Sequence, residues 1–569
     1  MSIPIIPVAL SQADANKRRK RQTPKGRHVD AGALEEVQRL LGPDSRQRDL
    51  LIENLHKIQD SFGHLSAAHL AALAQEMHLA QTEVFEVASF YHHFDIVKEG
   101  ETPPAALTVR VCDGLSCELA GAADLLARLP VLLGKEVRVL AAPCIGRCEQ
   151  APAVMVGQTP VPHAGCNAVL AQAAAVPTRH LPAGHIDLAS YSAAGGYALL
   201  RQCESGERDA ESVITALESS GLRGLGGAGF PAGRKWRIVR AEPAPRLMAV
   251  NIDEGEPGTF KDRVLLERDP HRFIEGMLIA AWAVGISRIY VYLRDEYHGC
   301  RAMLETEFEK LRAHPPIAEM PDIILRRGAG AYICGEESAM IESIEGKRGM
   351  PRLRPPYVAQ VGLFGRPTLE HNFETLYWVR ELVEKGGAWF ASHGRNGRQG
   401  LRSFSVSGRV KNPGVKLAPA GIDIQDLIDE YCGGMQEGHT FYAYLPGGAS
   451  GGILPASLNR IPLDFDTLQP YGCFIGSAAV IVLSDHDSAV GAARNMMRFF
   501  KHESCGQCTP CRNGTAKASA LIERPSWNID LLADLSAVMR DASICGLGQA
   551  APNPIDCVIK YFPQELKNT

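Results

Sequence analysis

The chain lacks several features that would place it in a simple class. Its 569 residues contain no apolar run near the roughly 20 residues that span a bilayer. The first residues lack the apolar core and small-residue cleavage site of a secretory signal. A formal net charge of −4 gives no general attraction to nucleic acid. We therefore expect a cytoplasmic protein with no direct membrane insertion and no nucleic acid partner.

The chain is too long for one hydrophobic core, so we expect several domains. Hydrophobic residues make up 45% and charged residues 22%, which is ordinary for a globular protein. In a reducing compartment, the 15 cysteines are better explained as metal ligands and buried thiols than as disulfides.

One cysteine quartet consists of two close pairs, Cys112/Cys117 and Cys144/Cys148, with C-x4-C and C-x3-C spacing. Each pair directly follows a predicted strand, at 107–111 and 136–140, with a predicted helix at 122–132 between them. Zinc sites usually use C-x2-C pairs. The spacing therefore favours a [2Fe–2S] cluster, with zinc as the alternative.

A second quartet begins with C-x2-C-x2-C at Cys505, Cys508 and Cys511. A self-contained bacterial ferredoxin would place another cysteine four residues later, where Thr515 stands. We predict Cys545 as the distant fourth ligand and Cys557 as a weaker candidate. The pattern favours a [4Fe–4S] cluster over zinc.

Three glycine-rich loops accompany the cysteines, at 224–229, 251–258 and 328–337. The second and third follow predicted strands (247–252 and 323–326), and loops at the carboxyl ends of strands are where ligands bind in α/β folds. Glycine permits close backbone approach to a ligand, and carboxylates in such loops accept hydrogen bonds from sugar hydroxyls. We interpret Asp262 and Glu267, which lie just beyond, as solvated turn residues.

These motifs together resemble the NADH-oxidising module of respiratory complex I. Residues 31–175 are similar to its thioredoxin-like [2Fe–2S] subunit, including the run VASFY at 87–91. Residues 200–569 are similar to its flavin subunit, including GAGFP around Phe230, DEGEPGTFKDR from Asp253 and GAGAYICGEES from Gly328. The resemblance departs from the family at Leu225, where arginine is common, and at His371, whose contact with flavin is left open.

The resemblance implies a multidomain α/β and α+β fold with a Rossmann-like FMN domain. Its expected parts are a basic flexible extension (1–30), a helical plus thioredoxin-like [2Fe–2S] domain (31–175), a linker (176–195), an FMN- and NAD-binding domain (196–400), a ubiquitin-like β-grasp (SLBB) module (401–485) and a helical [4Fe–4S] domain (486–569).

The resemblance also implies the site residues. FMN would contact Gly224, Gly226, Gly227, Lys235, Asn251, Asp253, Glu254, Glu256, Tyr332, Gly335, Glu336, Glu337 and Asn372. NAD(H) would use Phe230, Glu337, Arg354 and Tyr357, and we predict Glu256 and Glu337 as the catalytic residues. Cys112, Cys117, Cys144 and Cys148 would hold the [2Fe–2S] cluster, and Cys505, Cys508, Cys511 and Cys545 the [4Fe–4S] cluster.

The fusion of both parts in one chain resembles the diaphorase subunits of NAD-dependent formate dehydrogenases and NAD-reducing hydrogenases. We expect hydride exchange between NAD(H) and FMN, followed by single-electron transfer through the clusters. The expected partner is a molybdenum- or tungsten-containing formate-oxidising subunit with further iron–sulfur clusters. A hydrogenase diaphorase, a complex I component and a zinc-stabilised nucleotide-binding scaffold are the alternatives.

Overall fold

The computed structural model describes residues 26–43, 46–175 and 181–566, so most of the predicted basic extension lies outside the described residues. The chain forms two compact units, Met1–Pro104 and Ala105–Thr569. The predicted domain of residues 31–175 is therefore divided near residue 104, because its helical part forms a unit of its own.

The first unit is helical, as the spacing of Leu70, Leu73 and Met77 predicts, and these three side chains are buried. Ser66 begins one helix by accepting a hydrogen bond from the His69 amide at 3.0 Å. The elements are α2 (Ala31–Leu41), α3 (Leu51–Phe62), α4 (Ala67–Glu76), α5 (Gln81–Phe90) and a short parallel pair of strands, β1 (Leu65–Ser66) and β2 (Ile96–Val97).

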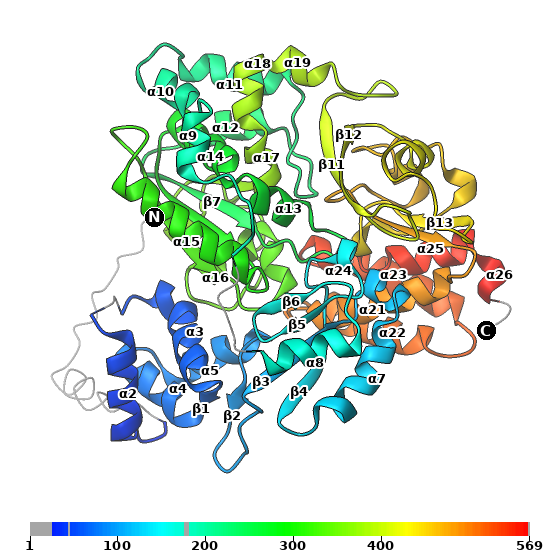
Figure 1. Ribbon diagram of the computed structural model, residues 1–569, viewed down its shortest axis with the longest axis horizontal. Helices are drawn as coiled ribbons and strands as arrows, with labels where there is room; N and C mark the ends of the chain where they lie inside the picture. Colours follow the sequence, from blue (N-terminus) through cyan, green and yellow to red (C-terminus); the bar gives the residue numbers. More distant parts are fainter. Residues whose placement is uncertain (1–25, 44–45, 176–180, 567–569) are drawn as a thin grey trace, which may run out of the picture. The chain divides into compact units, whose positions relative to one another are not determined.

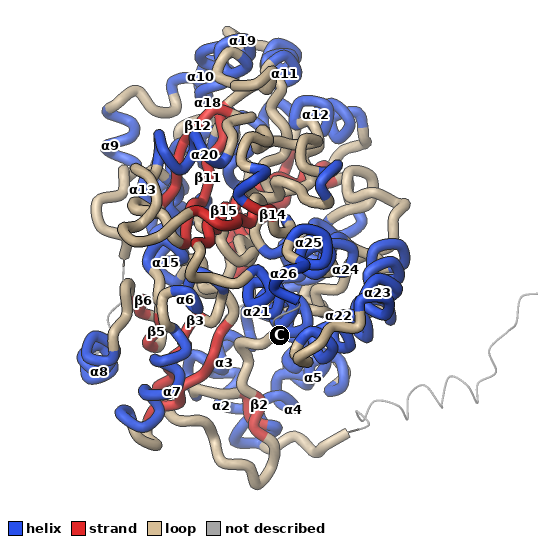
Figure 2. The backbone as a smooth tube through the Cα atoms, turned by 90° about the vertical axis from the view of Figure 1, so that its right-hand side faces the viewer, coloured by secondary structure: helices blue, strands red, loops and turns tan. Residues whose placement is uncertain are grey.

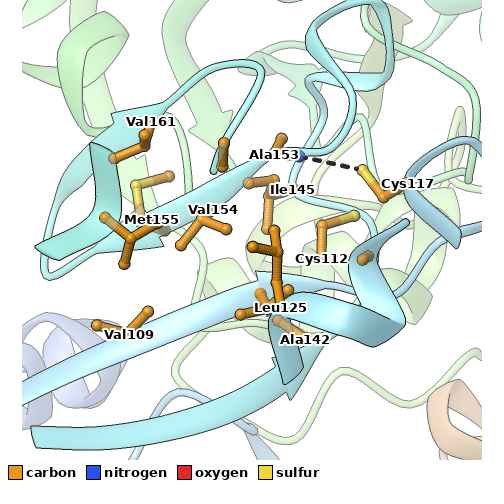
Figure 3. Close-up of a cluster of buried hydrophobic side chains, with 14 of the residues drawn as sticks. Val109, Cys112, Cys117, Leu125, Ala142, Ile145, Ala153, Val154, Met155 and Val161 are labelled. Carbon is orange, nitrogen blue, oxygen red and sulfur yellow. Dashed lines mark hydrogen bonds between the residues drawn. The ribbon is translucent and has the colours of Figure 1, made fainter. Parts of the chain in front are cut away.

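The second unit begins with a small α/β domain, residues 105–175. Its sheet has the order β4-β3-β5-β6, in which β3 is parallel to β4 and antiparallel to β5. Strands β3 (Leu107–Cys112) and β4 (Val137–Ala142) and helix α7 (Ala122–Leu133) lie where the sequence predicts them, whereas β5 (Val154–Val156) and β6 (Thr159–Val161) are too short to predict. Figure 3 shows the apolar cluster of this domain, with Cys112 and Cys117 at its edge.

A parallel-sheet domain follows, with the strand order β10-β7-β8-β9. The strands are β7 (Arg246–Ile252), β8 (Ile286–Leu293), β9 (Asp322–Arg327) and β10 (Thr368–Asn372). In Figure 1, α14 (Pro270–Val284) lies above β7, and α15 (His298–Ala313) and α16 (Glu337–Ile344) lie below it. The remaining helices are α9 (Leu188–Ala193), α10 (Ala198–Glu204), α11 (Ala210–Ser219), α12 (Ala232–Ala241), α13 (Lys261–Arg268), α17 (Phe373–Tyr377), α18 (Val379–Lys385) and α19 (Gly387–Ala391).

The strand order places a topological switch point between β7 and β10. The chain moves from β7 to β8 and β9 on one side, and β10 then pairs with β7 on the other side. Asn251 and Asn372, at the carboxyl ends of these two strands, are register partners. Ligands of open α/β sheets bind in the crevice at such a point.

The second half of the predicted linker at 176–195 contains a helix. Residues Leu188–Ala193 form α9, and Tyr191 is buried with its hydroxyl donating to Glu275 Oε2 at 2.5 Å. The segment rich in Pro, Ala and Gly therefore contains a helix that is anchored to α14, because Tyr191 donates to the buried carboxylate of Glu275.

A mixed-sheet domain and a C-terminal helical domain complete the unit. The sheet has the order β12-β11-β15-β13-β14. Its strands are β11 (Leu401–Gly408), β12 (Gly414–Pro419), β13 (Phe441–Leu445), β14 (Leu454–Pro455) and β15 (Ala479–Ser484). Figure 2 shows the final helices gathered in one group: α21 (Ala489–Glu503), α22 (Thr509–Ile522), α23 (Ile529–Ala542), α24 (Gly546–Ala550), α25 (Asn553–Tyr561) and α26 (Pro563–Leu566). Among the described helices, none has both the length and the apolar character needed to cross a membrane.

We predict that Gly276→Ala destabilises the parallel-sheet domain. A Cβ at Gly276 on α14 would lie 2.1 Å from the Leu376 backbone oxygen, and a backbone atom cannot move aside cheaply. We expect a loss of roughly 1–3 kcal/mol, measured as a lower thermal midpoint. Gly491→Ala on α21 is the control, since its nearest contact is 3.5 Å. Equal midpoints for the two variants would contradict the packing described.

Candidate cofactor sites

The first cysteine quartet forms one buried cluster of sulfurs. Cys112, Cys117, Cys144 and Cys148 are each at most 6% exposed. The Sγ atoms of Cys144 and Cys148 lie 3.3 Å apart, and the Ala153 amide donates to Cys117 Sγ at 3.4 Å (Figure 3). Hydrogen bonds from Cys112 and Cys148 lower the pKa of Cys144 well below its usual value. Four converging thiols, one of them readily ionised, fit the ligand set of a [2Fe–2S] cluster.

The loop that carries Cys117 is held by a helix of the C-terminal domain. Asn495 on α21 donates to the Asp113 carbonyl at 2.8 Å and to Glu118 Oε2 at 2.6 Å. Arg498, one turn later, donates to the same Glu118 oxygen at 2.8 Å. The first ligand loop is thus fixed by residues more than 370 positions away in the sequence.

The four cysteines of the second quartet line one small cavity. Cys505, Cys508, Cys511 and Cys545 all face it, together with Ile333 and Pro351 of the parallel-sheet domain among others. Burial raises the pKa of Cys545 to about 12 and that of Cys511 to about 11. Because iron binds the thiolate, cluster binding must release these protons.

Two features of this cavity suit an iron–sulfur cluster. The backbone amides of Leu547 and Gly548 donate to the Cys545 sulfur and lower its pKa, against the larger effect of burial. Gly548 also has no room for a side chain, since a Cβ would lie 2.8 Å from Cys511 Cβ. Cys557, the weaker ligand candidate, lies elsewhere, with its sulfur 3.5 Å from Cys473 Sγ.

The predicted flavin residues meet at the switch point of the parallel sheet. Asn251 Nδ2 donates to the Gly335 carbonyl at 2.9 Å, which ties loop 251–258 to loop 328–337. A Cβ on Gly335 would lie 3.2 Å from the Asp253 carbonyl. Gly226 of the first loop lies against Asn372, where a Cβ would approach Asn372 Cβ to 2.9 Å. All three glycine loops therefore reach one crevice.

Asp253 supplies the observation that tests this crevice for a ligand. Its Oδ2 atom is buried and has no hydrogen-bond partner among the described residues. Burial raises the pKa of this carboxyl well above its usual value. A buried polar atom without a partner is costly, and a sugar-like hydroxyl group would satisfy it. The residues therefore fit FMN, whose ribityl chain carries such hydroxyls.

Glu256 and Tyr332 form a pair between the flavin crevice and the second cysteine quartet. The Tyr332 hydroxyl donates to Glu256 Oε2, and the Ser450 amide donates to Glu256 Oε1 at 2.7 Å. The Tyr332 amide donates to Glu503 Oε2 at 2.9 Å, and Glu503 ends the helix before Cys505. The backbone at 332–333 thus runs from the crevice to the wall of the cluster cavity.

The predicted nicotinamide residues are partly brought together. Arg354 pairs with Glu336 and, at 3.0 Å, with Glu337. Burial, and then the charge of Glu370, raise the pKa of Glu337. Lys235, predicted as an FMN contact, donates to Glu370 Oε2 at 3.2 Å. Phe230 and Tyr357 are 39% and 56% exposed as residues, which leaves them accessible to a ligand.

Three sequence interpretations need correction. Glu254 does not face the crevice, because its carboxylate accepts the Asp262 and Arg263 amides at 2.8 and 3.1 Å and the Tyr297 hydroxyl at 2.8 Å. Asp262 is no solvated turn residue, since it is 2% exposed and accepts from Asn372 Nδ2 at 2.7 Å.

Glu267 is no solvated turn residue either, since it is partly buried on a helix and pairs with Arg147 and Arg263. His371, whose contact with flavin the sequence leaves open, is buried, and its Nε2 accepts from Trp236 Nε1 at 2.7 Å. Arg294 was not predicted from the sequence as a site residue. Its position directly after a parallel strand, where ligands bind in α/β folds, could have indicated it.

Comparison with known proteins identifies related families over three regions of the chain. Three family descriptions match the chain: Nuo51 FMN-binding domain at 217–381, NADH-ubiquinone oxidoreductase-F iron-sulfur binding region at 491–569, and thioredoxin-like [2Fe-2S] ferredoxin at 37–171. An NADH-quinone oxidoreductase subunit of Rhizobium meliloti (strain 1021) is 40% identical over 402 residues, covering 68% of this chain and 94% of that protein. The mitochondrial NADH-ubiquinone oxidoreductase 51 kDa subunit of Neurospora crassa is 40% identical over 375 residues, covering 62% and 76%.

A solved structure extends the likeness over nearly the whole chain. A chain of NAD+-reducing [NiFe]-hydrogenase in the H2-reduced state superposes with a TM-score of 0.80 at 34% identity, covering 92% of this chain and 93% of that chain.

The fold and the sites define an iron–sulfur flavoprotein that binds NADH and transfers electrons. The chain belongs to the family of the complex I 51 kDa flavin subunit, here joined to a thioredoxin-like [2Fe–2S] region. Its cofactors are FMN, a [4Fe–4S] cluster and a [2Fe–2S] cluster, and NAD(H) is the family's substrate. The two cysteine-rich regions thus belong to iron–sulfur families, and the zinc alternative is set aside.

We predict that Cys545→Ser removes the [4Fe–4S] electron paramagnetic resonance (EPR) signal, because four thiolates are needed to hold the cluster. FMN content and the [2Fe–2S] signal should be retained. Cys557→Ser is the matched control, since this buried cysteine of the same domain is not among the cavity residues. A [4Fe–4S] signal that survives in Cys545→Ser but is lost in Cys557→Ser would reverse the ligand assignment.

Proposed function

We propose that this chain is the diaphorase subunit of an NAD-dependent formate dehydrogenase. In this role it exchanges hydride between NAD(H) and FMN and passes single electrons to or from a molybdenum- or tungsten-containing partner subunit. The observation that carries the diaphorase part is the union of one flavin crevice and two cysteine quartets in a single chain, matched over 92% of its length by a hydrogenase chain.

FMN, when bound, supplies the conversion between two-electron hydride transfer and one-electron steps. The chain's own residues position it. Asn251 joins two of the crevice loops, and Asp253 presents a buried acceptor oxygen. Glu337, at the start of α16, offers a carboxylate beside Arg354, where it would accept a hydrogen bond from the nicotinamide amide.

Tyr332 and Ile333 support the electron path in this proposal. Tyr332 contacts Glu256 in the crevice, and Ile333 lines the cavity of the second quartet. Adjacent residues of one loop therefore contact the flavin crevice and line the cavity of the cysteines that would hold the [4Fe–4S] cluster. We infer that this cluster connects the flavin to the partner subunit.

Hydrogen is the second candidate donor, and a specific observation favours it. The structural match is to an NAD+-reducing [NiFe]-hydrogenase, and it covers the fused N-terminal region as well as the flavin region. The formate proposal relies on the same fusion, which the formate dehydrogenase diaphorases share.

The partner distinguishes the two donors. We expect the complex purified from the native source to reduce NAD⁺ with formate and to contain molybdenum or tungsten. Formate- and H2-dependent NAD⁺ reduction should be assayed on the same preparation, with metal analysis for molybdenum, tungsten and nickel. Nickel together with H2-dependent reduction would replace formate by hydrogen and leave the diaphorase role intact.

We predict that Glu337→Gln lowers NADH–ferricyanide turnover by about tenfold or more, which corresponds to losing about one charge-assisted hydrogen bond to the substrate. FMN content and both cluster signals should stay at the level of the unaltered protein. Glu211→Gln is the control, because Glu211 forms an exposed ion pair with Arg237. Unchanged turnover in Glu337→Gln would remove this residue from the nicotinamide site.

A further inference from the structure

Arg294 lies between the [2Fe–2S] ligand loop and the flavin loop. It follows β8 directly and is 5% exposed. Its Nη2 atom donates to the Cys144 carbonyl at 2.7 Å, and its Nη1 atom donates to the Glu254 carbonyl. One guanidinium group of the flavin domain therefore binds the backbone of a cluster ligand and the backbone of the loop that carries Asp253.

The rest of the second ligand loop is held from the same side. Arg263 Nε donates to the Gly146 carbonyl at 2.9 Å, and Gly146 lies against the Tyr297 ring, with no room for a Cβ. Arg147 donates to Glu267 Oε1 at 3.2 Å. The loop between Cys144 and Cys148 is thus fixed by the flavin domain, so that Arg294 cannot move away from Cys144 without breaking several contacts.

The charge on Arg294 is paired with one carboxylate. Glu296 accepts from its Nε at 3.0 Å and from its Nη2 at 2.6 Å, and the Tyr297 ring lies 5.1 Å from its Cζ. A buried positive charge beside a ligand favours the cluster state with one more electron, because charges interact strongly where water is excluded. Net charge and hydrogen bonding are known levers on cluster potentials.

We propose that Arg294 is a positioning residue through which the flavin domain raises the reduction potential of the [2Fe–2S] cluster. Glu296 opposes it, since a carboxylate close to the guanidinium reduces its field at Cys144. The proposal rests on the assignment of Cys144 as a cluster ligand. That assignment is tested separately by Cys144→Ser, which should abolish the [2Fe–2S] EPR signal.

The experiment is a redox titration of the full chain, with both clusters monitored by EPR. We expect Arg294→Gln to make reduction of the [2Fe–2S] cluster about tenfold less favourable, which is a fall of about 59 mV for a one-electron couple. Arg294→Lys, which keeps the charge, should restore most of the potential. Glu296→Gln should shift the potential upward. The [4Fe–4S] potential, read in the same samples, should stay constant.

Arg402→Gln is the matched control, because Arg402 is a buried arginine of the mixed-sheet domain that pairs with Asp464. An unchanged [2Fe–2S] potential in Arg294→Gln would overturn the proposal. Equal shifts in the Gln and Lys variants would overturn it too, since the cause would then be loop geometry and not charge. If Arg294→Gln assembles no cluster, the sign of the Glu296→Gln shift decides, and a fall or no change is a contradiction.

Discussion

The parallel pairing of β7 with β10 determines where the chemistry of this chain takes place. Because Asn251 lies opposite Asn372, two loops leave the sheet at the same edge and on either side of the switch point. The glycine loop at 224–229 reaches Asn372, and the loop at 328–337 is tied to Asn251. A shift of one residue in this register would turn the two asparagines to opposite faces and separate the loops that form the crevice.

Buried charges form a second layer behind the crevice. The Nζ atom of Lys261 lies 2.6 Å from Asp262 Oδ1 and 3.0 Å from Glu374 Oε2. All three side chains are nearly inaccessible to solvent. Asp262 in turn accepts from Asn372, so the orientation of a residue that lines the crevice depends on a lysine behind it. Buried ion pairs of this kind contribute little net stability, and their role here is to fix the geometry of Asn372.

The parts that were predictable from the sequence are those whose signal is local. Cysteine spacing identified both quartets, and short apolar runs followed by glycine and acidic residues identified the strand ends that line the crevice. The errors concern residues whose partners lie far away in the chain. Glu254 resembles a crevice residue and Asp262 a surface residue until Tyr297 and Asn372 are brought beside them. Likewise, nothing near Tyr191 shows that Glu275 will anchor it.

The two [2Fe–2S] ligand loops are held by different domains, one by Asn495 and Arg498 on α21 and the other by Arg263 and Arg294. Residues from three parts of the second unit must therefore be in place before the four sulfurs converge. We expect cluster insertion at this site to follow the folding of the flavin and C-terminal regions. Joining the regions in one polypeptide makes this convergence intramolecular, so that maturation does not depend on the cellular concentration of a separate polypeptide.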